Sequence, residues 1–542
     1  MLLPDEDDQR FHHGVRLLRD KEWDQARILF EALLRRHPAH PLIHANQALV
    51  QEHLGHGEAA RSHHQQAIEG APQSSELRFN WANFLRQQGS VASLAEAQEQ
   101  YLAVLMLDPQ HLGAWINLGN GLFETGRLSA AKTAFQAALS IAPQHPSALL
   151  NLAQVALNLQ ENHESLAVFD QVLTLYPNLL EAHRGLATCA SRLGLEEKAQ
   201  KHRLLGYGPQ PVIVLPGLGQ GPFFTLLILA SAQDGNIPWQ PLLQRQRHHT
   251  TIVAVEFFPP ATPLPPHDCL FNAIGDADRC ASSLMHAQTL LTSHNTRIPL
   301  INAPERIEVT GRTHLASLVH DIPHVATART EPFPRSRELP VAEEACKLEA
   351  WIKAREFTFP LLLRAPGFHG GQYFERAQNP SDLDNVLRQF PGDDLLVMES
   401  LSTQTTGDGL IRKFRVMMLG GRLYPIHLAF SFHWKVHYFS SLMSSRPDLR
   451  AEEQRFLNNF AGYLGPQAVS ALKSIQQRLG LDYGGMDFAL DAQGGILLFE
   501  ANATMVLHPP PDDPIWDYRR PSFEQALKAA RNLIDCSVRP TD

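Results

Sequence analysis

The chain has few cysteines, and their spacing predicts neither a disulfide framework nor a zinc site. There are five, an odd number, and no two form a CxxC pair. The sequence also lacks a block of five or more basic residues, so a phosphate-backbone interface is not predicted. No apolar run reaches the roughly 18 residues of a membrane span. We therefore expect no nucleic-acid partner and no membrane partner.

The first residues do not show the pattern of a signal peptide. Residues 1–10 read MLLPDEDDQR, without a basic segment or an apolar segment, and we predict a cytoplasmic protein. What the chain does have is length and apolar content, with 542 residues of which 44% are hydrophobic, and a modest net charge of -9. This length exceeds what one hydrophobic core usually serves, so we expect several packed domains.

Residues 1–205 carry an internal repeat. Prolines that end helical segments recur at intervals of 34, 37, 34 and 34 residues, at Pro38, Pro72, Pro109, Pro143 and Pro177. A period of 34 is the length of the tetratricopeptide repeat. The unit before Pro143 resembles that family at its characteristic positions, which are Trp115, Leu118, Gly119, Leu122, Ala131, Phe135 and Ala138. We expect five repeats plus a capping helix, which form either a groove for a peptide or protein partner or a packing and dimerisation module.

The helical pattern breaks at residues 206–211, which contain two glycines and two prolines. Beyond this linker, predicted strands alternate with predicted helices, which indicates a parallel α/β layer. The strands are expected at Val212–Leu215, Thr251–Phe257 and Asp268–Asn272, and the helices at 277–291 and 313–319. The predicted fold class is thus multidomain. An all-α repeat solenoid precedes an α/β region, which divides into 212–330 and 331–535.

From about Val212 to Leu533 the chain resembles ATP-grasp ligases of the glutathione-synthetase-like type. One motif is a buried strand and a glycine-rich loop over residues 359–372. The resemblance implies that Arg364 neutralises nucleotide phosphates. Glycines let backbone N–H groups approach phosphate oxygens, here at Gly367, Gly370 and Gly371. The family usually has lysine in place of Arg364, so the contact geometry differs. The alternative is a glycine hairpin with a surface arginine.

Residues 395–400 resemble the family's hinge strand, against which adenine rests. This implies nucleotide contacts from Glu399 and from the backbone near Leu401, although the segment could equally be an ordinary core strand. A hairpin with a Gly-Gly turn is predicted over residues 411–424. In it, Arg415 resembles the arginine that steadies phosphates or the acyl-phosphate, whereas Lys413 stands where relatives often have aspartate.

A lysine-histidine segment follows this hairpin. Lys435 lies between His433 and His437 on one face of a predicted strand, at a place where relatives contact substrate and the γ-phosphate. This pattern indicates either a carboxylate-binding face or a half-exposed strand.

The strongest resemblance covers residues 482–502, two predicted strands joined by a turn at Asp491. Alternation places Glu500 and Asn502 on one face of the second strand, and antiparallel pairing brings Asp487 opposite them. Magnesium prefers oxygen ligands and usually binds through a few carboxylates and the nucleotide phosphates. The sequence therefore predicts a magnesium site at Asp487, Glu500 and Asn502.

The resemblance implies an ATP- and magnesium-dependent ligase. ATP would phosphorylate a substrate carboxylate, and an amine or related nucleophile would attack the acyl-phosphate. An alternative is a non-catalytic nucleotide-binding adaptor, indicated by Arg364 and Lys413. A glycosyltransferase with tetratricopeptide repeats is a third possibility, which the hairpin of residues 482–502 fits poorly. Neither the acid nor the nucleophile is identified by the sequence, because variable loops build substrate pockets.

Overall fold

The computed structural model describes residues 3–218, 222–294, 298–336, 338–368, 371–401, 408–436, 438, 442–511 and 513–537. The chain divides into two compact units. The first contains residues 1–193 with the short segments 216–223 and 245–247, and the second contains the rest. None of the helices in these described ranges is long and apolar enough to cross a membrane. The predicted fold class, helical repeats followed by a mixed α/β region, is confirmed.

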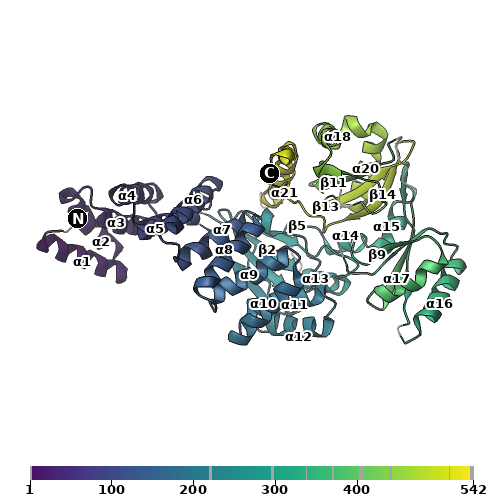
Figure 1. Ribbon diagram of the computed structural model, residues 1–542, viewed down its shortest axis with the longest axis horizontal. Helices are drawn as coiled ribbons and strands as arrows, with labels where there is room; N and C mark the ends of the chain where they lie inside the picture. The colour runs from purple at the N-terminus through teal and green to yellow at the C-terminus, as the bar shows by residue number, and fades with distance from the viewer. Residues whose placement is uncertain are drawn as a thin grey trace. The chain divides into compact units, whose positions relative to one another are not determined.

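The first unit is built from helical hairpins, drawn in purple and blue in Figure 1. Successive pairs of helices pack against each other, α1 with α2 and so on to α9 with α10, and α11 follows. Their bounds are α1 (Asp5–Arg19), α2 (Trp23–Arg36), α3 (Pro41–His53), α4 (Gly57–Gly70), α5 (Ser75–Gln88), α6 (Val91–Leu107), α7 (Leu112–Glu124), α8 (Leu128–Ile141), α9 (Pro146–Asn158), α10 (Asn162–Leu175) and α11 (Leu180–Arg192). The next helix, α12 (Glu196–Tyr207), belongs to the second unit.

Small residues let the two helices of a hairpin approach closely. At Gly119 in α7, an added Cβ would lie 2.6 Å from the ring of Phe135 in α8. Gly14 and Phe30 repeat this contact between α1 and α2, where the corresponding distance is 2.7 Å. Phe135 and Phe30 are both fully buried. Each ring therefore fills the space that its glycine leaves, and close packing makes any extra atom there costly.

We expect Gly119→Ala to destabilise the repeat unit by about 1–3 kcal/mol, because the new methyl group overlaps the Phe135 ring. The matched control is Gly121→Ala on the same helix, where the added Cβ would meet only Gln98 at 3.5 Å. That change should be neutral or stabilising by up to about 1 kcal/mol, since alanine favours helix. Thermal unfolding followed by circular dichroism compares the two. An equal melting temperature for both variants would contradict the packing argument.

The second unit begins with a five-stranded sheet in the order β1-β3-β2-β4-β5. Strands β2 to β5 are parallel, and β1 is an antiparallel edge strand. The strands are β1 (Val212–Leu215), β2 (Phe224–Ala230), β3 (His248–Ala254), β4 (Cys269–Asn272) and β5 (Leu300–Ile301), and the helices are α13 (Ala281–His294), α14 (Pro304–Glu308) and α15 (Arg312–Val319). The strand order reverses between β2 and β4. Ligands of such sheets bind outside the carboxyl ends of the strands near this point.

Two antiparallel-rich sheets complete the unit, with the orders β7-β10-β8-β9 and β12-β11-β13-β14-β6. The smaller contains β7 (Thr330–Pro334), β8 (Leu361–Arg364), β9 (Phe374–Ala377) and β10 (Asp394–Glu399), with α16 (Val341–Ala354) and α17 (Leu383–Gln389). The larger contains β6 (Val325–Thr327), β11 (Ile411–Leu419), β12 (Arg422–Ser431), β13 (Tyr483–Leu490) and β14 (Ile496–Asn502), with α18 (Pro447–Asn458), α19 (Phe460–Leu464), α20 (Pro466–Leu479) and α21 (Arg520–Ser537). Short 3-10 helices lie at Gln240–Leu242, Pro380–Asp382, Leu442–Ser444 and Pro514–Arg519.

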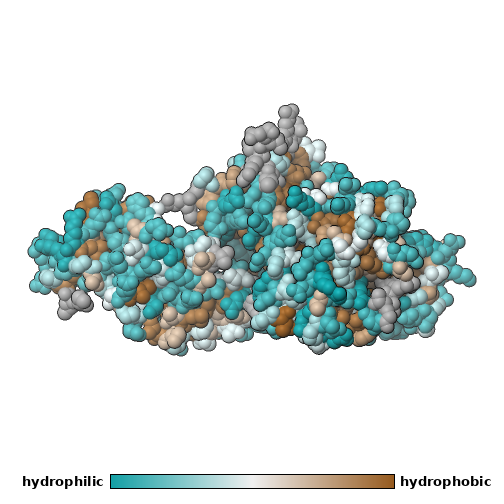
Figure 2. Space-filling view, turned by 90° about the horizontal axis from the view of Figure 1, so that it is seen from above, coloured by the Kyte–Doolittle hydropathy of each residue, from teal (hydrophilic) through white to brown (hydrophobic). Residues whose placement is uncertain are grey.

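One face of the larger sheet is the core of the unit. Phe414, Phe430 and Phe488 are fully buried there, and Phe414 contacts Phe456 of α18. Helices α18 and α20 cover this face (Figure 1). The opposite face carries the charged residues described below. On the outside, hydrophilic residues dominate the face seen in Figure 2, and hydrophobic ones form small separate patches.

Candidate functional site

Four ionisable side chains form a row across the larger sheet. In the register, His427 of β12 lies opposite Arg415 of β11, Arg415 opposite Asp487 of β13, and Asp487 opposite Glu500 of β14. Directly opposed residues in antiparallel strands point to the same face, so the four side chains share one face. The predicted pairing of the two strands that carry Asp487 and Glu500 is therefore present.

Two β-bulges produce this row. In β14, Asp487 pairs with Glu500 while the next residue, Phe488, pairs with Leu498, so one extra residue is inserted. Leu498 consequently faces the core and Glu500 faces the other way, although they are two positions apart. A similar shift in β12 lies beside His427. Bulges redirect side chains in this manner and are frequent next to functional sites.

Asp487 is held by two cations of its own sheet. Arg415 donates to both carboxylate oxygens, from Nε at 2.6 Å and from Nη2 at 2.8 Å, and the Lys413 Nζ lies 2.7 Å from Oδ2. The Asp487 side chain is only 1% exposed. Burial alone would raise its pKa, but Arg415 and Lys413 outweigh burial and hold the pKa well below the usual range. Asp487 is therefore ionised, and both of its carboxylate oxygens have cationic partners.

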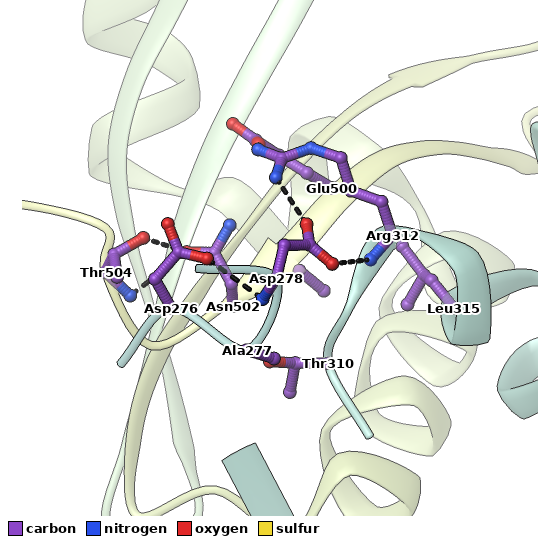
Figure 3. Close-up of a pocket in the computed structure, with 10 residues that line it drawn as sticks. Asp276, Ala277, Asp278, Thr310, Arg312, Leu315, Glu500, Asn502 and Thr504 are labelled. Atoms are coloured by element: carbon purple, nitrogen blue, oxygen red, sulfur yellow. Dashed lines mark hydrogen bonds and ion pairs between the residues drawn. The ribbon is translucent and has the colours of Figure 1, made fainter. Parts of the chain in front are cut away.

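Glu500 contacts a different arginine. Arg312, at the start of α15, donates from Nη2 to Glu500 Oε2 at 3.2 Å and from Nη1 to Asp278 Oδ2 at 2.7 Å (Figure 3). Burial opposes ionisation of Glu500, but the cations around it, with Arg312 the largest contributor, keep the pKa below the usual range. These residues line a pocket together with Asp276, Ala277, Thr310, Leu315, Ala501, Asn502 and Thr504. The pocket is lined by the loop after β4 and by the end of β14.

The three predicted metal ligands differ in how many of their side-chain oxygens already have a hydrogen-bond or ion-pair partner. Asn502 Oδ1 accepts from the backbone N–H of Thr504 at 3.1 Å and from its hydroxyl at 2.9 Å, and Asp487 has the three bonds above. Glu500 is the predicted ligand with an available oxygen, because within the described residues its Oε1 has no hydrogen-bond partner. A magnesium ion bound by Glu500 and by nucleotide phosphates fits this donor set. Within these ranges, no three His, Cys, Asp or Glu side chains are grouped to hold a metal ion.

Arg364 ends β8, and its guanidinium group is partly tied to the glycine-rich loop. Nη2 donates to the Phe368 carbonyl at 2.6 Å, and the group lies 5.3 Å from the Phe374 ring centroid. Its Nε is buried and has no partner within the described part of the chain. Burial, together with the nearby Arg312 cation, lowers the pKa of Arg364 to about 10. The glycines Gly367 and Gly371 both have positive φ, and Gly370 lies outside the described residues.

Lys435 is placed differently from the sequence prediction. Strand β12 ends at Ser431, where its pairing with Ile411 of β11 ends, so Lys435 follows in a bend and the strand predicted around it is wrong. Its Nζ donates to the Phe374 carbonyl at 2.9 Å and lies 3.6 Å from Glu375. The same Phe374 packs beside Arg364. Of the two histidines predicted to share a strand face with Lys435, His433 is exposed and His437 lies outside the described residues.

The predicted adenine contacts lie on the smaller sheet. Glu399 ends β10, and its carboxylate accepts from Arg329 Nε at 3.2 Å and from the Arg329 backbone N–H at 3.3 Å. Leu401 is part-buried just beyond the strand. The structure does not bring Glu399 into contact with the row of charges.

Two acidic residues of the pocket were missed by sequence reasoning. Asp276 and Asp278 come from the loop after β4, and Asp276 Oδ1 accepts from the backbone N–H groups of Asp278 and Arg279. Arg279 in turn donates to the Gly367 carbonyl at 3.2 Å. Their signal was an Asp-Ala-Asp triplet close to the carboxyl end of a buried parallel strand, a usual ligand position. His427 had no comparable signal, because the bulge beside it determines its face.

The comparisons with known proteins concern the helical repeats. Residues 12–75, 90–146 and 116–179 match the tetratricopeptide repeat family. The first part of the chain therefore consists of tetratricopeptide repeats, which are typical of protein-protein interaction. None of the curated proteins matches the chain.

Several solved structures are similar to part of the chain. PilF of Pseudomonas aeruginosa is 19% identical, with a TM-score of 0.34 over 38% of this chain and 92% of that one. MamA is 17% identical, with a TM-score of 0.29 over 31% of this chain and 90% of that one. YrrB, described as a TPR protein with an unusual peptide-binding site, is 16% identical, with a TM-score of 0.31 over 34% and 92%.

Proposed function

We propose that the α/β region is an ATP-grasp-type ligase that joins a carboxylate to an amine or related nucleophile, with ADP and phosphate as products. The observation that carries the proposal is the row of His427, Arg415, Asp487 and Glu500 across adjacent strands, with Arg312 and Arg364 beside it. Carboxylates and arginine cations gathered at one place suit a substrate that brings both phosphate groups and a metal ion.

In the proposed reaction, a carboxylate oxygen of the substrate attacks the γ-phosphorus of ATP, the bond to the bridging oxygen breaks, and ADP leaves. The nucleophile then attacks the acyl carbon, phosphate leaves with the C–O bond electrons, and the amine proton passes to solvent. Arg364 and Arg415 would bind phosphate oxygens, and Lys435 would orient the carboxylate. A magnesium ion, when bound, supplies positive charge to the phosphates. No side-chain nucleophile is required, because positioning and charge supply the rate.

The tetratricopeptide repeats support a peptide or protein as substrate or partner. In this proposal, the repeats bind the polypeptide and raise its local concentration near the α/β unit. The second candidate is a nucleotide-binding adaptor without turnover. It is favoured by Asp487, whose three bonds to Arg415 and Lys413 leave it no open oxygen for a metal ion.

Product analysis tests the ligase. The full-length protein is incubated with ATP, magnesium and cell extract fractionated by size, and the nucleotide products are measured. We expect ADP and phosphate to form only with a fraction that contains the substrate, and heat-denatured protein serves as the control. AMP and pyrophosphate as products would contradict the acyl-phosphate route. ATP binding without turnover in any fraction would favour the adaptor.

A further inference from the structure

Lys413 forms an ion pair with Asp487. Its Nζ lies 2.7 Å from Oδ2, while Arg415, which is directly opposite Asp487 in the register, donates to Oδ1 and Oδ2. The Lys413 side chain is 19% exposed, against 1% for Asp487. Lys413 is therefore more accessible than the carboxylate with which it pairs.

The charges around the row are balanced by the chain itself. Asp487 faces Lys413 and Arg415, and Glu500 and Asp278 face Arg312. A divalent ion at Asp487 would compete with two charge-assisted hydrogen bonds from Arg415 and with the ion pair to Lys413, all at a buried carboxylate. Glu500 differs, because one of its oxygens has no partner among the described residues, and its side chain is 29% exposed.

We propose that the ammonium group of Lys413 takes the place of a metal ion on Asp487, so that the site binds a nucleotide with a single divalent cation held on the Glu500 side. This inference rests on the proposed nucleotide-binding function and specifies its metal requirement. Lys413 acts as a built-in cation. It contributes charge toward the phosphates on the Asp487 side, and Glu500 contributes the ligand on the other side.

The stoichiometry of bound metal tests this inference. Equilibrium dialysis with manganese and the non-hydrolysable imido analogue of ATP gives the number of ions per bound nucleotide, with free manganese read by electron paramagnetic resonance. We expect a single ion in the wild type and a second ion in Lys413→Met, because Oδ2 of Asp487 then has only its hydrogen bond to Arg415 and can accept a metal ion in place of the ammonium group. Lys413→Arg keeps the cation and should retain the single ion. Lys473→Met, which removes an exposed lysine of α20, is the matched control and should not change the count.

A second measurement uses the same proteins without metal. Because the wild type carries its own cation, it should retain weak binding of the analogue in the presence of a chelator, and Lys413→Met should lose on the order of tenfold in that affinity. Two manganese ions per nucleotide in the wild type would overturn this inference but not the proposed nucleotide binding. An unchanged number of ions in a folded Lys413→Met protein would do the same. If Lys413→Met does not fold, the number of bound ions in Lys413→Gln and in the wild type tests the inference instead. A wild type that binds no nucleotide would instead contradict the proposed function.

Discussion

Replacing Asp487 by asparagine is expected to destabilise the α/β unit by about 3–5 kcal/mol, because removal of one partner leaves buried charge uncompensated. Arg415 and Lys413 both depend on this carboxylate, through bonds of 2.6, 2.8 and 2.7 Å. An amide keeps the shape but has one acceptor oxygen and no charge. Differential scanning calorimetry on the full-length protein measures the shift of the transition that belongs to this unit.

An exposed pair, in which an arginine also contacts both oxygens of an aspartate, provides the control. Arg478 binds both oxygens of Asp321 at 2.8 and 3.1 Å, but the aspartate side chain is 53% exposed. Exposed pairs contribute little, so Asp321→Asn should cost less than about 1 kcal/mol. Equal shifts for the two variants would contradict the idea that burial gives the Asp487 cluster its importance.

The Asp487 effect should also depend on pH. A carboxyl group whose folded pKa is held low contributes stability above its unfolded pKa, near about 4, and that contribution falls as the pH drops below this value. The variant has no such group. The difference in unfolding temperature between wild type and Asp487→Asn should therefore be largest near neutral pH and should narrow below about pH 4.

Local patterns made the repeats and the hairpins predictable. The small residues and aromatic rings of a helical hairpin, such as Gly119 and Phe135, recur at fixed spacing because each unit packs in the same way. The hairpin between β11 and β12 was likewise predictable, because Gly420 and Gly421 both adopt positive φ in the turn. The pairing of β13 with β14 was predictable from the turn between them, whereas the bulge sets Glu500 opposite Asp487.

Contacts between distant segments could not be predicted in this way. Alternation alone cannot locate the bulge in β14, because the inserted residue shifts the register and interrupts the alternation. The partner of Glu500 is Arg312, which is 188 positions away in the chain. Arg415 was interpreted as a phosphate ligand, but its bonds to Asp487 depend on side-chain orientation across the sheet. The roles of Arg415, Lys435 and the metal ligands remain proposals.

Glu500→Gln is expected to weaken magnesium-dependent ATP binding on the order of 100-fold, because it removes the charge of the one predicted ligand that has an open oxygen. The substitution should leave the fold intact. Glutamine has nearly the same size, its Oε1 can still accept from Arg312, and Arg312 keeps its bond to Asp278 at 2.7 Å. Titration calorimetry of ATP into the full-length protein, with and without magnesium, measures the effect.

Comparing ATP affinity with and without magnesium distinguishes two roles for Glu500, binding the metal ion and acting only through its charge. If Glu500 binds the ion, the loss should occur with magnesium present and vanish without it, where removing a negative charge near the phosphates would even improve binding slightly. The matched control Glu349→Gln changes an exposed glutamate on α16 and should bind ATP as the wild type does. Equal ATP affinity of wild type and Glu500→Gln in magnesium would remove Glu500 from the metal site. The nucleotide would then be bound by the cations Arg364, Lys413 and Arg415 alone.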